Sequence, residues 1–161
     1  MSVDQAQATL TRAASFWADR SDSWGAWDEP GGDVRARYTA NCLRELDGFL
    51  RNLLDEIQPA SNRRQRNTAN KLGRMPLRGG HVAADAPRLR AIGRSAGCLF
   101  HCGGWVRRPD ETAGRWMTAG WPEAHGRALR RYSLGDRLRP GPREVADMCG
   151  FFVRVGDAVA R

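Results

Sequence analysis

The sequence predicts an all-α protein: an antiparallel helical bundle of four to five helices, with a Gly- and Trp-rich loop or short hairpin between the last two. Two observations lead to this fold class. Apolar residues recur at the helical period in several segments, and Gly and Pro separate those segments. A chain of 161 residues is long enough for one well-buried core and short for two, so we expect a single domain over 1–161.

The first helix is expected at about 3–20, with Asp4 as its N-terminal cap. The second is expected at about 33–57, and Pro59 ends it. The second helix carries the clearest pattern in the chain, because its apolar side chains form one continuous stripe. We expect this stripe in the core: Val34, Tyr38, Cys42, Leu43, Leu46, Phe49, Leu50, Leu53, Leu54 and Ile57.

Two more helices are expected after Pro87 and over about 142–159. Gly103-Gly104 ends the first of them. The stretch 105–121 between them predicts a loop or short hairpin, and residues 133–138 predict a brief extended segment. Bulky side chains help to order a Gly-rich loop, so packing is favoured over base stacking for Trp105, Trp116 and Trp121.

The charge balance points to a polyanionic partner. The formal net charge is +8, and Lys71 is the only lysine, so nearly all of the positive charge is guanidinium, which suits phosphate. Nucleic acid is the leading partner class, and a soluble protein that happens to be basic is the alternative. The segment 61–86 is either a solvated helix followed by a loop or a segment that orders on a polyanion. The nucleic-acid contacts predicted here and on the following helix are Arg63, Arg64, Arg66, Lys71, Arg74, Arg78 and Arg90.

Neither an export signal nor an apolar run of membrane-spanning length is visible, so we expect a cytoplasmic protein without membrane contact. The four cysteines are scattered, which favours free, mostly buried thiols in a reducing compartment. A zinc site formed by Cys98, His101, Cys102 and Cys149 is the weaker alternative, because the chain has no Cys-x-x-Cys pair. No metal or cofactor is therefore expected.

Arg94 and His101 form the candidate catalytic pair. Six residues separate them on one expected helix, and seven steps of about 100° bring both side chains to nearly the same face. An imidazole can move protons and a guanidinium can stabilise charge that develops on a phosphate, so the pair is suited to metal-independent RNA cleavage. A helix cap and an ordinary surface arginine are the alternative interpretation.

Three stretches follow one another in an order typical of a known family. They are the long amphipathic helix YTANCLRELDGFLRNLLDEI, the helix end RSAGCLFHCGGWVRRPD and the C-terminal segment YSLGDRLRPGPREVADMCGFFVRVGDAVA. In this order they resemble the core helix, the helix that bears the Arg and His, and the segment leading into the closing helix of the HEPN superfamily of helical nucleotide- and RNA-binding domains, in particular of its RiboL-PSP-like branch. The likeness covers roughly residues 34–160.

The resemblance implies a metal-independent endoribonuclease that works as a homodimer, plausibly a toxin or defence effector with an antitoxin or regulatory protein as partner. It implies that His101 acts as general base or general acid and that Arg94 stabilises the phosphorane. The chain departs from the usual motif at Ser95, Ala96 and Cys102. A catalytically inactive HEPN-like module that binds nucleic acid or a partner protein is therefore the alternative.

Overall fold

The chain is mostly helical in the computed structural model, which describes residues 1–24, 32–58, 65–75, 83–124 and 126–161. A two-stranded antiparallel hairpin separates the last two helices, where the sequence predicts a loop or short hairpin. In chain order the elements are α1 (Val3–Ser21), α2 (Gly32–Ile57), α3 (Thr68–Gly73), the 3-10 turn η1 (Ala83–Asp85), α4 (Ala86–Cys102), β1 (Trp116–Pro122), β2 (Leu129–Ser133) and α5 (Pro142–Ala160).

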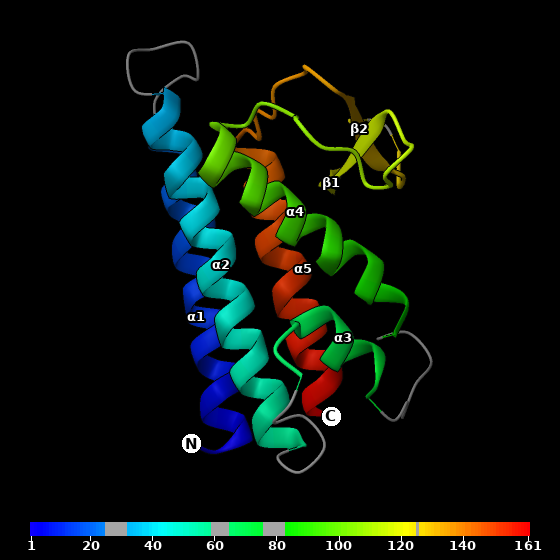
Figure 1. Ribbon diagram of the computed structural model, residues 1–161. Helices are drawn as coiled ribbons and strands as arrows, with labels where there is room; N and C mark the ends of the chain where they lie inside the picture. The colour runs from blue at the N-terminus through cyan, green and yellow to red at the C-terminus, as the bar shows by residue number, and fades with distance from the viewer. Residues whose placement is uncertain (25–31, 59–64, 76–82, 125) are drawn as a thin grey trace.

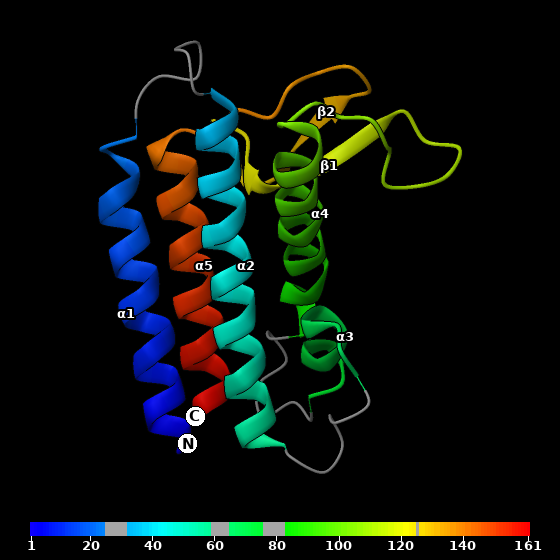
Figure 2. The same ribbon diagram turned by 60° about the vertical axis from the view of Figure 1, so that its left-hand side comes forward.

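The helices α1, α2 and α5 lie side by side, and α4 lies on the opposite side of α2 from α1 (Figures 1 and 2). The hairpin packs on α4, and the short α3 packs on α4 and α2. The first and last helices contact each other closely, and both chain termini lie at the same end of the molecule (Figure 1). This arrangement leaves one side of α2 and one side of α4 next to each other at the surface.

Helix α1 begins with a capping box, and Ser2 caps it in place of the predicted Asp4. The Ser2 hydroxyl accepts a hydrogen bond from the Gln5 backbone N–H at 3.2 Å, and the Gln5 side chain accepts one from the Ser2 N–H at 3.0 Å. Two N–H groups that the helix leaves without partners are thus satisfied. Asp4 instead lies in the first turn, where its charge favours the positive end of the helix dipole.

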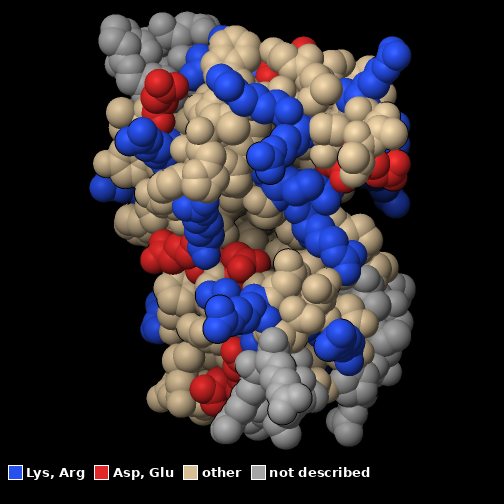
Figure 3. All heavy atoms as spheres, viewed as in Figure 1, with Lys and Arg blue, Asp and Glu red and all other residues tan. Residues whose placement is uncertain are grey.

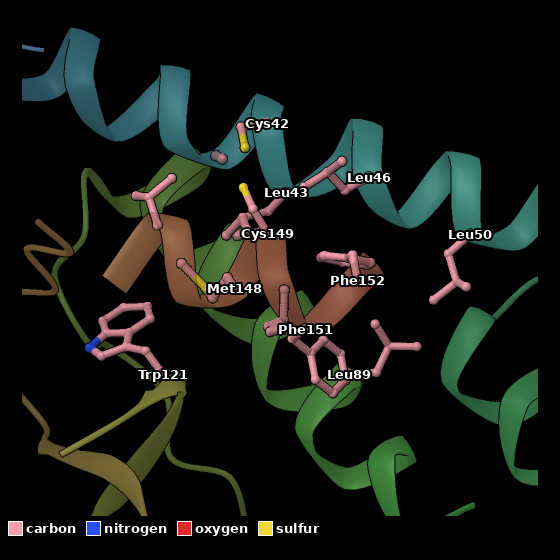
Figure 4. Packing of buried hydrophobic residues seen from close by; sticks show 14 of the residues in the cluster. Cys42, Leu43, Leu46, Leu50, Leu89, Trp121, Met148, Cys149, Phe151 and Phe152 are labelled. Atoms are coloured by element: carbon pink, nitrogen blue, oxygen red, sulfur yellow. The ribbon is translucent and has the colours of Figure 1, made fainter. Parts of the chain in front are cut away.

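The core lies between α2 and α5, with Leu89 of α4 and Trp121 of β1 packed beside them (Figure 4). Cys42 of α2 and Cys149 of α5 point toward each other there, and the four cysteines are free, as predicted (Figure 4). The expected stripe on α2 is wrong in its first two turns, because Val34 and Tyr38 are exposed. Ala36 and Ala40 are fully buried at the same level of the helix, so the core side of α2 runs through these alanines, and Val34 and Tyr38 lie on another side.

The hairpin meets α4 at one close contact. A Cβ added at Gly120 would lie 2.3 Å from Cγ1 of Ile92, so only glycine fits where β1 crosses α4. The Gly120 N–H donates to the Ser95 hydroxyl, and its carbonyl accepts from Nε of Arg88. Of the three tryptophans predicted to pack, Trp121 is buried, whereas Trp105 and Trp116 are half exposed, so that prediction is wrong for two of them.

Gly103 and Gly104 end α4 as predicted. Their φ angles are 58° and 89°, a left-handed conformation that suits glycine and turns the chain away from the helix. His101 therefore lies in the last turn of α4, next to the N-terminal half of α2. None of the helices described here has the length and the apolar character that crossing a bilayer requires.

Candidate nucleic-acid interface

A cleft of about 700 Å³ lies between α2, α3 and α4. Its lining combines a cationic rim, an apolar floor and, among the described residues, a single carboxylate, Asp47. The same face of the molecule shows Lys and Arg side chains gathered over α2 and α4, around a hollow (Figure 3). The guanidinium groups of the rim belong to Arg44, Arg51, Arg66, Arg90 and Arg94.

Helical periodicity explains why these arginines share one cleft. Arg44 and Arg51 are seven residues apart on α2, so they project from the same side two turns apart. Arg90 and Arg94 are four residues apart on α4 and also share a side. The helices α2 and α4 run in opposite directions (Figure 1). Both pairs line the same cleft, one from each helix, so they form two facing rows.

Most of this charge is not neutralised within the described part of the chain. No described carboxylate forms an ion pair with Arg44, Arg51, Arg66 or Arg90; the nearest partner of Arg90 is the Asn70 side-chain oxygen, at 3.1 Å. Guanidinium groups crowded in this way repel one another and favour an anion between them. The cleft is therefore suited to a ligand with several phosphates.

Arg94 is held in place by the loop that precedes the hairpin. Its Nε lies 2.9 Å from Oδ1 of Asp110, and the other carboxylate oxygen of Asp110 accepts a hydrogen bond from the Thr118 N–H at 3.0 Å. The Arg94 side chain stays 38% exposed. Asp110 thus ties the guanidinium to β1 while leaving it at the cleft.

His101 is exposed and contacts Arg44. Its Nε2 lies 3.3 Å from Nη2 of Arg44, whose guanidinium also lies over the Phe100 ring, 4.0 Å from the centroid. A guanidinium has donors only, so a hydrogen bond between these two atoms needs Nε2 as the acceptor. The structure thus gives the two residues of the candidate pair different partners: Arg94 binds Asp110, and His101 binds Arg44.

The predicted contacts in the basic segment have mixed outcomes. Arg66 and Arg90 line the cleft, and Arg74 is exposed at the end of α3, outside the lining. Arg63, Arg64 and Arg78 lie outside the described residues.

Lys71 is the clear correction among these contacts. Its side chain is only 3% exposed and is paired with Asp55 of α2, so it is not available to nucleic acid. Helix α3 packs against α2 and α4, and its buried residues include Ala69 and Leu72 as well as Lys71. A count of positive charges in the sequence does not distinguish such a buried, paired lysine from a solvated cation.

Sequence reasoning missed three cleft residues on α2: Arg44, Asp47 and Arg51. Their spacing of three and four residues was a usable signal, because it places them on one polar side of a helix whose other side is apolar. The Arg-rich segment 61–86 is the stronger charge signal in the sequence, so the charge pattern predicted the interface there and not on α2.

Asp47 is half-buried in the cleft and binds α3. The Thr68 hydroxyl donates to its Oδ2 at 2.8 Å. Burial raises the pKa of the Asp47 carboxyl above its ordinary value, and the Thr68 hydrogen bond and the nearby Arg51 charge oppose that rise. Elsewhere in the described residues, no group of three or more His, Cys, Asp or Glu side chains is placed to hold a metal ion.

Comparison of the chain with protein families, with curated proteins and with solved structures gives no match. The functional argument therefore depends on the cleft itself.

Proposed function

We propose that the protein binds RNA, with the sugar-phosphate backbone in the cleft between α2 and α4. The observation that supports this is the lining: among the described residues, four arginines on facing sides of α2 and α4, a fifth, Arg66, just before α3, and one carboxylate. Arginines bind phosphate through forked donors, and a groove that follows a backbone with positive charge is the usual basis of single-strand binding. The formal net charge of +8 favours the encounter with a polyanion.

A second candidate function is metal-independent cleavage of that RNA, and the exposed His101 ring beside Arg44 favours it. In this scheme Arg44 moves from Nε2 of His101 to the phosphate, Nε2 takes the proton of a ribose 2′-OH, and the 2′-oxygen attacks the adjacent phosphorus. The P–O5′ bond breaks, giving a 2′,3′-cyclic phosphate and a 5′-hydroxyl. Arg44 and Arg94 stabilise the charge of the phosphorane.

The leaving 5′-oxygen needs a proton. The resemblance to HEPN domains offers a source, because a two-fold homodimer would bring the His101 of a second copy, protonated on both ring nitrogens, to the same phosphate, where it gives a proton to O5′. That likeness also suggests a cytoplasmic toxin or defence effector, with an antitoxin or regulatory protein as further partner. If the protein only binds RNA, it corresponds to the inactive HEPN-like module.

Binding is tested by fluorescence anisotropy with a labelled single-stranded oligoribonucleotide. Arg44→Glu and Arg94→Glu should each weaken binding at least tenfold, because each replaces an attraction to phosphate by a repulsion. Arg12→Glu is the matched control: Arg12 is exposed on α1, outside the cleft, and the change in net charge is the same. Equal losses in all three variants would mean that only net charge matters and would contradict the cleft.

Cleavage is tested with the same oligoribonucleotide in EDTA, with the products analysed for a 2′,3′-cyclic phosphate. The wild-type protein should cut, and His101→Ala should not. His101→Ala should still bind, because the arginines remain. Binding without cutting in both proteins would reject cleavage and leave the binding proposal intact.

A further inference from the structure

The cleft has a part that phosphate binding does not require. Besides the arginine rim, the described lining has an apolar floor of five buried side chains: Leu43, Ala69, Leu89, Ile92 and Ala96. Phosphates prefer hydrated, cationic surroundings and gain nothing from an apolar floor, whereas a flat ring does. A volume of about 700 Å³ is that of a site for an organic molecule of nucleotide size.

The α4 side of the cleft is bare at two positions. Gly93 and Gly97 are one turn apart and both line the cleft, and a Cβ added at either would meet no atom within 4 Å. The open space thus continues up to the helix backbone. Each glycine in a helix interior costs about 1 kcal/mol relative to alanine, so helix stability alone does not favour glycine here. A planar base fits against such a surface.

Asp47 is the one carboxylate among the described lining residues, and it lies between arginines. It opposes the binding of phosphate by like-charge repulsion, so a cleft for phosphate alone would be better without it. As an ionised carboxylate it only accepts hydrogen bonds. Thr68 donates one hydrogen bond to Oδ2. A carboxylate has about four acceptor positions, so the remaining ones are enough for a ligand with two N–H donors.

We infer that the cleft takes an unpaired guanine, whose N1–H and N2 amino group donate to Asp47 while the ring lies between the apolar floor and Gly93 and Gly97. Guanine presents two adjacent donors on its Watson–Crick edge, which match the two oxygens of a carboxylate. Uracil presents one N–H between two carbonyl oxygens, which a carboxylate repels. This inference rests on the proposed RNA binding and adds its substrate class: single-stranded RNA that contains guanine.

The probes are a short oligouridylate and the same oligouridylate with one central guanine, adenine or cytosine, measured by anisotropy. The wild-type protein should bind the guanine probe roughly tenfold more tightly than the all-uridine probe, the size of one good base contact. Annealing the guanine probe to its complement should remove this preference, because pairing occupies the same edge of the base.

Asp47→Asn separates base reading from structure. An asparagine oxygen still accepts the Thr68 hydrogen bond, but its amide group no longer offers two acceptors to guanine. The guanine preference should fall to within about twofold, while the all-uridine probe binds at least as well as before, since a negative charge has left the cleft. Arg44→Glu should weaken both probes alike.

A second variant keeps the inference testable if Asp47→Asn does not fold. At Gly97 an added Cβ meets no atom within 4 Å, and the longer side chain of Gly97→Leu would extend into the cleft, so the fold should be kept and the guanine preference lost. Equal binding of all single-stranded probes, or a preference for adenine or cytosine, would overturn the guanine assignment while RNA binding stands. If no probe binds, or if Arg44→Glu changes nothing, the proposed function itself fails.

Discussion

Nη2 of Arg44 lies 3.3 Å from Nε2 of His101, which joins α2 to the last turn of α4 across 57 residues of sequence. A guanidinium has donors only and imidazole Nε2 has one lone pair, so Arg44 occupies the position at which His101 would accept a proton. A phosphate that draws Arg44 away would free Nε2 and lie beside it, the arrangement that attack by a 2′-OH requires.

Removal of the Arg44 side chain tests this arrangement. Under the cleavage proposal, Arg44→Ala should lower the single-turnover rate of RNA cutting in EDTA by about 100-fold, the typical loss when one donor to a developing oxyanion is removed. Arg12→Ala should leave the rate unchanged. A rate for Arg44→Ala close to that of the wild type, at saturating RNA, would exclude a role for Arg44 in the chemical step.

Lys71 should matter for stability and not for binding. Asp55→Asn leaves the nearly inaccessible Lys71 ammonium without its charged partner, which should lower the free energy of unfolding by about 1–3 kcal/mol. Urea denaturation followed by circular dichroism measures this loss. At a temperature where both proteins are folded, the RNA affinity of Asp55→Asn should equal that of the wild type. A specific loss of affinity would indicate that Lys71 belongs to the RNA interface after all.

Gly120 and Gly150 should respond in opposite ways to alanine. Gly120→Ala forces a Cβ toward Ile92, where both a side-chain atom and the α4 backbone lie within 3.0 Å, so overpacking should cost about 1–3 kcal/mol. Gly150 is exposed inside α5 and a Cβ there meets nothing within 4 Å, so Gly150→Ala should stabilise by about 0.5–1 kcal/mol. Thermal denaturation should show melting temperatures that move in opposite directions; a shared direction would contradict the packing described for the hairpin.

The raised pKa of Asp47 gives a pH dependence with a defined sign. The folded state holds the Asp47 proton more tightly than the unfolded chain does, so this group stabilises the fold fully below its unfolded pKa of 3.8 and loses that contribution as the pH rises through the folded pKa. Melting temperatures of wild type and Asp47→Asn, measured from about pH 4 to pH 7, should show the wild type losing stability relative to the variant. If the difference in melting temperature between the two proteins stays constant, or changes in the opposite direction, burial does not raise the pKa of Asp47.

The sequence predicted the helices well where a strong local signal exists. Pro59, Gly103 and the Pro142 region fix helix ends by backbone chemistry alone, so these boundaries agree with the structure within about two residues. Residue size misled at the start of α2, because the large apolar residues Val34 and Tyr38 were placed in the core, whereas the small Ala36 and Ala40 occupy it.

The candidate site was harder to predict than the helices, because it is tertiary. His101 was singled out from its own helix, yet its contact Arg44 comes from another one, and no spacing rule relates the two. The same limit applies to Lys71, whose burial depends on how α3 docks on α2. Arg66 and Arg90 were found by charge alone, and Arg44 and Arg51 were missed, although the cleft brings all four together.

The salt dependence of RNA binding tests the central claim most directly, since each arginine that contacts a phosphate adds to the slope of log K against log salt concentration. For single strands the expected contribution is about 0.7 per contact. The double variant Arg44→Ala/Arg94→Ala should therefore have a slope smaller by about 1.4 than the wild type between about 50 and 200 mM salt. Arg12→Ala should match the wild type. A double variant with the wild-type slope would show that the phosphates do not lie in the cleft between α2 and α4.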